Sequence, residues 1–400
     1  MIFNKGCGEY KLINMRFTVL TPYLPLFAGM SAFIITWLFI PRIIKISYEK
    51  NLCDDPSIDQ RKLHIHATPT LGGVAIFAAI LFTFLIGPYA LQTWTPYLIA
   101  GLIVLFFSGI KDDIFTISPL NKLIFQILAV ALLIIGDGLV ITDLGGVFGF
   151  HQIPYWPGFL LTMFTMIVVI NSYNLIDGVD GLAGGVGVIA STFFAWWFWQ
   201  TGMMAHAVLA IALTGSLLAF LRFNFSPASI FMGDTGSQVV GFLLVFLAVS
   251  FVKTGVEATG TIPFGEVVPV LVLSVLIVPL YDTLRVFLMR TFRKQSPFHA
   301  DRLHVHHQLL DMGLTHKSTC YIIFTFNLAI IGLTIWLPAM NINFLFVIVL
   351  LSAVALFPTF HLKRKTLSLF GISFPSKKNI KKTGQARNNN EIEREERIAV

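Results

Sequence analysis

The chain alternates between long apolar runs and short polar segments along most of its 400 residues. Each apolar run approaches the length of about 20 residues that a helix needs to cross a bilayer. Because backbone polar groups in lipid must be satisfied within the segment, such continuous runs predict helices. A transmembrane barrel would instead show segments of about ten residues with alternating hydrophobicity. The pattern therefore predicts an all-α, polytopic integral membrane protein.

Eleven apolar runs, which we interpret as spans, cover residues 18–43, 70–87, 94–110, 121–136, 157–175, 182–200, 204–221, 236–252, 265–289, 318–337 and 341–361. The first run is too long for the core of a signal peptide. The chain then divides into an N-terminal segment (1–17), a membrane domain (18–361) and a charged tail (362–400) that we expect to be disordered. We find no internal repeat, so an inverted-repeat transporter gains no support.

The basic residues indicate the orientation in the membrane. They are concentrated in the loops 44–69, 111–120, 222–235 and 290–317 and in the tail. The loops on the other side contain only Lys253. Because basic loops stay in the cytoplasm, we expect the N-terminus outside and the C-terminus in the cytoplasm. Lys5, Lys11 and Arg16 oppose this orientation, but the other flank of the first span carries more charge.

The composition is typical of a membrane protein and limits the kinds of partner that we expect. The chain is 56% hydrophobic and 12% charged, whereas soluble domains carry about 25% charged residues. Its net charge of +7 is explained by orientation and lipid contact, so we expect no nucleic-acid partner. Cys7, Cys53 and Cys320 share no spacing typical of a zinc site or a disulfide framework.

Five polar clusters fall on the predicted cytoplasmic side. They are DDPSIDQRKLHIHATPTLGG (54–73), KDDIFTISPLNK (111–122), NSYNLIDGVDGL (171–182), RFNFSPASIFMGDTGS (222–237) and FHADRLHVHHQLLDMGLTHK (298–317). The predicted outer loops have nothing comparable. Five separate segments on one face predict an active site built from helix ends on the cytoplasmic side.

Three carboxylates in these clusters are candidate metal ligands. Adjacent Asp112 and Asp113 repel one another unless a cation lies between them. Asp234 lies between Gly233 and Gly236, which let a ligand approach the backbone closely. Mg²⁺ usually takes one or two carboxylates and accepts phosphate oxygens as well. The alternatives are a solvated acidic pair and an Asp234 that only caps the next helix.

The stretch 171–182 carries two Asn and two Asp at three-residue spacing. Asn171 and Asn174 lie on one side of a helix, with Asp177 and Asp180 following toward its end. Amides and carboxylates together can bind a nucleobase edge and ribose hydroxyls. The alternative is a series of helix caps and turns.

The basic clusters can bind an anion. His304, His306 and His307 lack the cysteine or spaced acid that would favour zinc, and they suit a diphosphate or proton transfer. Arg302, just before them, favours the anion. His64 lies in a second basic group before TPTLGG, where phosphate binding and ordinary cytoplasmic charge are both open.

Together, TPTLGG, KDD, NSYNLIDGVDGL, FNFSPASIFMGDTGS and HVHH resemble the polyprenyl-phosphate N-acetylhexosamine-1-phosphate transferases over residues 20–340. The resemblance implies that undecaprenyl phosphate in the bacterial inner membrane attacks a UDP-amino sugar and releases UMP. The product would initiate a cell-envelope glycan such as O-antigen. It also implies Mg²⁺ as the cofactor, with Mn²⁺ as a substitute, and leaves a homodimer open.

The resemblance implies a role for each matching position. Asp112, Asp113 and Asp234 match acidic metal-binding and catalytic residues, and His304, His306 and His307 match essential histidines near the donor diphosphate. Asn174, Asp177, Asp180, Asn224 and Phe231 match residues around uridine, and Arg302, His64 and Asp54 are further substrate-binding candidates. Thr116 stands where some members have a third acid, so we give it no metal role.

The motif HVHH favours the branch that transfers GlcNAc-1-phosphate, because the UDP-MurNAc-pentapeptide enzyme usually has three consecutive histidines. Another UDP-HexNAc donor remains open. An intramembrane prenyltransferase would need two similar Asp-rich repeats, and the chain has one Asp-Asp pair at the end of a predicted span. A secondary transporter would place its charges near span centres, whereas these acids lie at span ends.

Overall fold

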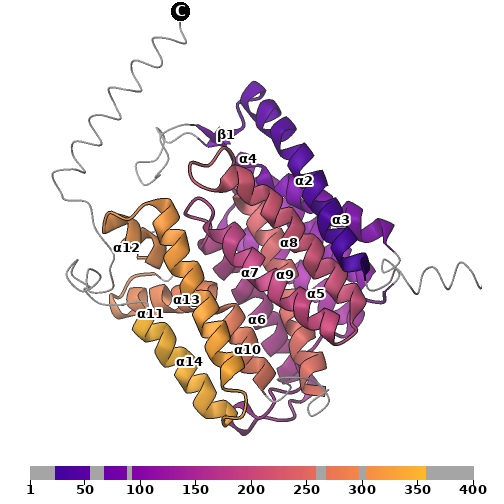
Figure 1. Ribbon diagram of the computed structural model, residues 1–400, viewed down its shortest axis with the longest axis vertical. Coiled ribbons are helices and arrows are strands. Elements are labelled where there is room, and N and C mark those ends of the chain that lie inside the picture. The colour runs from indigo at the N-terminus through magenta and orange to yellow at the C-terminus, as the bar shows by residue number, and fades with distance from the viewer. Residues whose placement is uncertain (1–22, 55–66, 88–91, 258–266, 297–302, 357–400) are drawn as a thin grey trace, which may run out of the picture.

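The computed structural model describes residues 23–54, 67–87, 92–257, 267–296 and 303–356 (Figure 1). The predictions for the N-terminal segment, the tail, His64 and Arg302 therefore lie outside the described residues. Asp54 is described only as backbone in a short strand.

The described chain is a bundle of helices (Figure 1). They are α2 (Leu24–Glu49), α3 (Gly72–Ile86), α4 (Thr95–Phe115), α5 (Pro119–Asp137), α6 (Tyr155–Leu175), α7 (Leu182–Gln200), α8 (Met204–Asn224), α9 (Gly233–Glu257), α10 (Val268–Val275), α11 (Ile277–Phe292), α12 (Val305–Asp311), α13 (His316–Trp336) and α14 (Ile342–Leu356), with the 3-10 helix η3 (Val147–Gly149). The strands β1 (Cys53–Asp54) and β2 (Thr68–Pro69) pair antiparallel. The predicted all-α class is confirmed apart from this two-residue ladder.

The helices also confirm a polytopic membrane protein. Every predicted span coincides with at least one helix. Seven described helices are long and apolar enough to cross a membrane, or eight if the bent pair α10 and α11 forms one span. The apolar helices α3 and α14 are shorter, and α4 carries three charged residues near its end. Eleven crossings therefore stay a prediction.

Two helices differ in detail from the expected spans. The expected span 265–289 is broken at Leu276, where α10 and α11 meet with a bend of 76°. Pro279 explains the break, because it lacks an N–H and is tolerated only in the first turn of the new helix. Helix α9 begins at Gly233, three residues before the expected start at 236, so Asp234 lies in its first turn.

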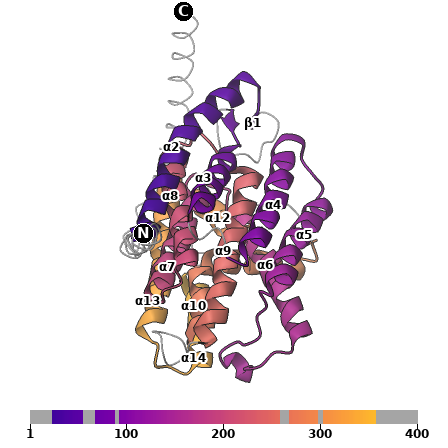
Figure 2. The same cartoon turned by 90° about the vertical axis from the view of Figure 1, so that its right-hand side faces the viewer.

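Helix α9 is the centre of the bundle. In the most apolar 18-residue stretch of α9, 83% of the residues are buried, compared with 33% for the corresponding stretch of α2 at the edge of the bundle. Figure 2 shows α9 between α6 and α7. Because neighbouring helices surround α9, its first turn is held in a fixed position, and that turn carries Asp234.

Glycines allow the backbones around this first turn to touch. A Cβ built on Gly73 in α3 would lie 2.1 Å from the backbone N of Gly236. One built on Gly109 in α4 would lie 2.4 Å from the Cα of Thr235. Two motifs distant in sequence are also joined by a backbone hydrogen bond, which Phe231 N donates to Pro69 O at 2.8 Å. The structure thus brings TPTLGG, KDD and FMGDTGS together.

Candidate active site

Asp113 binds the start of helix α9. Its Oδ1 accepts a hydrogen bond from the backbone N of Asp234 at 2.7 Å. Its Oδ2 accepts from the N of Thr235 at 3.1 Å and from the Thr235 hydroxyl at 2.6 Å. These N–H groups have no partner within the helix, and a negative charge is favourable at a helix N-terminus. Asp113 therefore acts as the cap that the sequence analysis considered for Asp234.

Lys122 of α5 joins two of the predicted carboxylates. Its Nζ lies 3.3 Å from Asp112 Oδ2 and forms an ion pair with Asp234 Oδ1. Asn174 of α6 donates to the same Asp234 oxygen at 2.6 Å, and its Oδ1 lies 3.3 Å from Lys122 Nζ. We call Asp112, Lys122, Asn174 and Asp234 the carboxylate–lysine cluster. The sequence analysis did not single out Lys122, although it ends the KDDIFTISPLNK segment.

A second polar layer lies one helical turn deeper. Gln126 follows Lys122 on α5 by four residues, Asn171 precedes Asn174 on α6 by three, and Gln238 follows Asp234 on α9 by four. Asn171 Nδ2 donates to Gln126 Oε1 at 2.7 Å, and Gln126 Nε2 lies 3.4 Å from Gln238 Oε1. These amides connect the three helices that carry the cluster.

The loop after α6 contributes two further carboxylates. Asp177 accepts a hydrogen bond from Gly233 N. Burial raises the pKa of Asp177 well above its ordinary value, and the negative charges of Asp234 and Asp113 raise it further.

Asp180 has a different environment. Its carboxylate lies 3.4 Å from His316 Nδ1 at the start of α13. Burial alone would raise the pKa of Asp180, but the hydrogen bond and the charge of His316 outweigh it and hold the pKa below its ordinary value. The sequence analysis missed His316, because a single His beside a span start carries no distinctive spacing.

Asn224 and Phe231 shape the neighbouring loops. Asn224 is 3% exposed, its Oδ1 accepts from Gly181 N at 2.9 Å and its Nδ2 donates to Ile230 O at 2.9 Å. Both ends of the amide are therefore used to join two loops. Phe231 is half-buried beside them. Uridine binding by either residue stays a prediction.

The three histidines lie on and just before the short helix α12. His304 Nδ1 lies 2.8 Å from Asp282 Oδ2 of α11. The rings of His304 and His306 have centroids 5.6 Å apart, and those of His306 and His307 are 4.3 Å apart. His306 contacts the Asp177–Asp180 loop, since a Cβ on Gly178 would lie 2.6 Å from His306 Nε2. Burial lowers the pKa of His306 to about 3.

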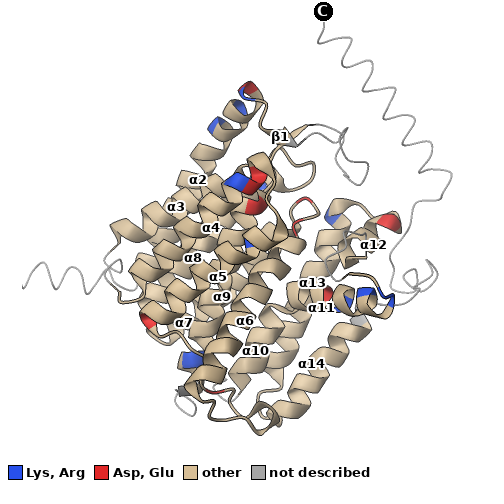
Figure 3. Ribbon diagram, turned by 180° about the vertical axis from the view of Figure 1, so that it is seen from behind, with Lys and Arg blue, Asp and Glu red and all other residues tan. Residues whose placement is uncertain are grey.

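Most predicted site residues that the structure describes thus come together. The carboxylate–lysine cluster, Asp113 and Asp177 form one group, and His306, whose ring lies beside those of His304 and His307, contacts the Asp177–Asp180 loop. Figure 3 shows the charged residues mostly at helix ends rather than along the middle of the bundle.

The donor set can be compared with what Mg²⁺ requires. No group of three His, Cys, Asp or Glu within the described ranges is arranged to hold a metal by itself. Asp112 and Asp234 nevertheless converge on one cation, the ammonium of Lys122. Two carboxylates suit Mg²⁺, which takes its other ligands from water and substrate phosphates. The residues therefore fit a metal that binds together with a phosphate-bearing substrate.

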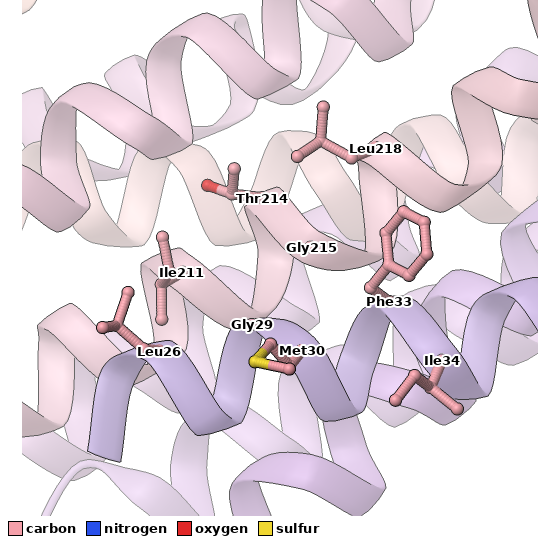
Figure 4. Close-up of a pocket in the computed structure, with 9 residues that line it drawn as sticks. All are labelled: Leu26, Gly29, Met30, Phe33, Ile34, Ile211, Thr214, Gly215 and Leu218. Atoms are coloured by element: carbon pink, nitrogen blue, oxygen red, sulfur yellow. The ribbon is translucent and has the colours of Figure 1, made fainter. Parts of the chain in front are cut away.

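A separate hollow lies between α2 and α8 (Figure 4). Its volume is about 310 Å³. It is lined by Leu26, Gly29, Met30, Phe33, Ile34, Ile211, Thr214, Gly215 and Leu218. Since this lining has no charged side chain, the hollow has no group that would bind a phosphate. The candidate site for phosphate chemistry is therefore the carboxylate–lysine cluster.

Comparison with known proteins identifies the family of the chain. A model of glycosyl transferase family 4 matches residues 95–252, which include α4 to α9. The chain is 31% identical over 320 residues to a "probable undecaprenyl-phosphate N-acetylglucosaminyl 1-phosphate transferase" of Bacillus subtilis, covering 76% of this chain and 84% of that protein.

Two relatives from other bacteria match in the same way. Both are named "undecaprenyl-phosphate alpha-N-acetylglucosaminyl 1-phosphate transferase". The protein of Salmonella typhi is 31% identical over 310 residues, covering 76% of this chain and 81% of its own. That of Escherichia coli K12 is 29% identical over 300 residues, covering 74% and 78%. The chain therefore belongs to glycosyl transferase family 4, as a membrane-embedded member of its polyprenyl-phosphate sugar-1-phosphate transferase group.

Proposed function

We propose that this protein transfers GlcNAc-1-phosphate from UDP-GlcNAc to undecaprenyl phosphate and releases UMP. The names of the relatives support this acceptor and this sugar. The observation that carries the proposal is the carboxylate–lysine cluster, in which one ammonium and two carboxylates meet at the ends of three helices. Such a site suits the meeting of two phosphates whose mutual repulsion must be neutralised.

The reaction is a single displacement at phosphorus. An oxygen of the acceptor phosphate forms a bond to the β-phosphorus of the donor, and the bond from that phosphorus to the UMP oxygen breaks. UMP leaves with the electron pair of that bond. Lys122 supplies a positive charge beside the reacting phosphates, and Asn174 keeps Asp234 in place.

We propose Mg²⁺ as the cofactor, with Asp112 and Asp234 as its ligands. When bound, it neutralises phosphate charge in the transition state. Asp113 has a different task, because both of its oxygens accept hydrogen bonds from the first turn of α9. It fixes the position of Asp234 and so acts through another residue.

The orientation of the site follows from the basic loops. We propose that the cluster faces the cytoplasm, where UDP-sugars are made, and that the N-terminus lies outside. The product would remain in the inner leaflet as a polyprenyl-diphosphate sugar and initiate a cell-envelope glycan. The histidines, which contact the Asp177–Asp180 loop, would then meet the donor diphosphate.

The test uses the purified full chain in detergent with undecaprenyl phosphate, Mg²⁺ and radiolabelled UDP-GlcNAc. We expect label to enter the lipid fraction, with an equal amount of UMP released and with loss of both on adding EDTA. UDP-GalNAc and UDP-MurNAc-pentapeptide are the alternative donors. Folded protein that uses none of the three would refute the transferase proposal, whereas use of another donor alone would correct the sugar.

A further inference from the structure

A buried group of polar side chains links α11 to the histidine segment, apart from the carboxylate–lysine cluster. Asp282 Oδ2 lies 2.8 Å from His304 Nδ1, and Asp282 Oδ1 accepts from the N of Val305 at 2.9 Å. Arg285 donates to the carbonyl of Leu303 and lies 3.4 Å from Asp282. Asp282 is 3%, Arg285 5% and His304 6% exposed. The α10–α11 bend gives α11 its own direction toward α12.

Stability alone does not explain why the chain keeps these charges. Removing an ion pair from water costs several kcal/mol per ion, and well-packed apolar residues are often as stabilising in its place. Ionisable residues within a predicted membrane domain are by default candidates for function. Asp282 and Arg285 lie inside the expected span 265–289, where apolar residues would have been the simplest choice.

The geometry determines which nitrogen of His304 carries a proton. An ionised carboxylate can only accept hydrogen bonds, so the 2.8 Å contact requires a proton on Nδ1. The other nitrogen, Nε2, points away from Asp282 because the two lie on different sides of the ring. A carboxylate that holds Nδ1–H also stabilises a positive charge on the imidazole.

His304 is connected to the proposed donor site through its neighbour. Its ring is stacked against that of His306, with centroids 5.6 Å apart and planes 11° apart. His306 in turn lies against Gly178, next to Asp177. Asp282 itself stays behind His304 and has its two oxygens engaged with α12. It can therefore affect a bound donor only through the imidazole.

We infer that Asp282 is a positioning residue for the transfer reaction. It fixes the ring of His304 with Nδ1–H toward the carboxylate and presents Nε2 to a phosphate of the nucleotide donor. Negative charge grows on the departing UMP phosphate as the bond breaks, and the Asp282-supported imidazolium stabilises that charge. The inference rests on the proposed function and adds a residue that its motifs do not contain.

The first test compares Asp282→Asn with wild type. The single amide oxygen can accept from His304 Nδ1–H or from Val305 N but not from both, so the variant removes the charge and one of the two hydrogen bonds. We expect kcat to fall on the order of 10- to 100-fold, as for other supporting partners of functional histidines, with little change in the KM for the UDP-sugar. Asp311→Asn, which removes an exposed carboxylate from α12, is the matched control. A wild-type kcat in Asp282→Asn would overturn the inference.

A double-mutant cycle tests whether Asp282 acts through His304. If it does, Asp282→Asn should change kcat by less than about twofold when His304 is already Gln. A merely structural contribution of Asp282 would add its full effect in both backgrounds. Additive losses would therefore overturn the inference, even if each single variant is impaired.

A measurement on the wild type covers the case in which the variants fail to fold. Protein labelled with ¹⁵N should show a protonated Nδ1 for His304, assigned in the wild type by sequential backbone correlations. An unprotonated Nδ1 would overturn the inference, because it cannot donate to Asp282. Absence of transfer by folded wild type would refute the proposed function instead, so the two failures are distinguishable.

Discussion

The carboxylate–lysine cluster and the Asp282–His304 pair hold their charges in opposite ways. In the cluster, the side chains of Asp234, Lys122 and Asp112 are 31%, 15% and 10% exposed. In the pair, the side chains of Asp282 and His304 are 4% and 7% exposed. The cluster is thus partly exposed, as the entry of phosphates and a cation requires, whereas the pair is closed, with Asp282 behind His304 and able to act on a substrate only through the imidazole.

The two regions also differ in how the chain assembles them. Partners in the cluster are as far as 112 residues apart, as for Lys122 and Asp234. Asp282 and His304 are separated by 22 residues, on neighbouring elements. The cluster therefore depends on how α4, α5, α6 and α9 pack, while the pair depends on α11 and α12. Substitutions should separate these two dependencies.

The largest effect is expected where the open cluster meets its substrates. Asp234→Asn keeps the size of the side chain but removes the charge that Lys122 and the proposed Mg²⁺ share. We expect loss of transfer by at least about 10³-fold, since charge placement is the main contribution in phosphoryl transfer. The measurement is UMP release at saturating UDP-GlcNAc.

The control for this variant is Asp143→Asn, which changes a carboxylate that accepts from Gly145 N in a loop between α5 and α6. Both variants should unfold within a few degrees of wild type. Near-normal transfer by Asp234→Asn would eliminate this residue as a metal ligand and leave the cluster without a chemical role.

Lys122→Gln should have the next largest effect. It removes the ammonium that two carboxylates share, so their repulsion is no longer balanced. We expect transfer to fall on the order of 10²-fold, comparable with losing one preorganised donor to a developing negative charge. The matched variant Lys111→Gln removes an exposed ammonium at the end of α4 and should retain activity. Equal activities in the two variants would show that Lys122 contributes only to the orientation of the chain in the membrane.

The open region could be predicted from the sequence better than the closed one. Hydropathy located a helix at each expected span, and polar residues at span ends identified Asp112, Asn174 and Asp234. Lys122 was missed because a lysine at a cytoplasmic span end already has an explanation in membrane orientation. Spacing alone could not show that Asp113 caps α9, because that contact depends on how two distant helices pack.

The closed region was missed for a related reason. Asp282 and Arg285 lie three residues apart in a run that was interpreted as one span, and the sequence analysis singled out neither of them. Two local signals were present. Pro279 is compatible with the first turn of a new helix rather than the middle of a long one. An acid and a base at i and i+3 can pair on one helix face.

The buried amide layer offers a sharper test of how packing supports the open cluster. Gln126 bonds to both Asn171 and Gln238, so Gln126→Leu removes a partner from each of these amides, although Asn171 keeps its bond to Ile167 O. We expect it to lower stability by about 1–3 kcal/mol and transfer by about tenfold. Gln238→Met should be milder, because Gln238 Nε2 is already buried without a hydrogen-bond partner. Thermal unfolding measures the effect on stability, and UMP release measures the effect on transfer. Equal losses in the two variants would contradict the hydrogen bonds assigned to Gln126 and Gln238.

The smallest effect is expected in the closed region and concerns stability rather than transfer. Burial lowers the pKa of His306 to about 3, whereas an unfolded histidine titrates near about 6.5. Between these values the unfolded chain binds a proton that the folded chain does not, so stability falls as pH decreases. One such group contributes at most about 1.4 kcal/mol per pH unit.

We therefore expect the unfolding temperature of His306→Gln to fall less, or rise more, than that of wild type between pH 7 and pH 5, by a few degrees. The raised pKa of Asp177 acts in the opposite direction in both proteins and cancels in this comparison. Asp180 does not interfere, because its pKa lies below its ordinary value and its contribution is lost only in more acidic solution. If His306→Gln had the same pH slope as wild type, the imidazole would titrate in the folded chain as it does in the unfolded chain. The region around His304 would then have to be open to water, as the carboxylate–lysine cluster is.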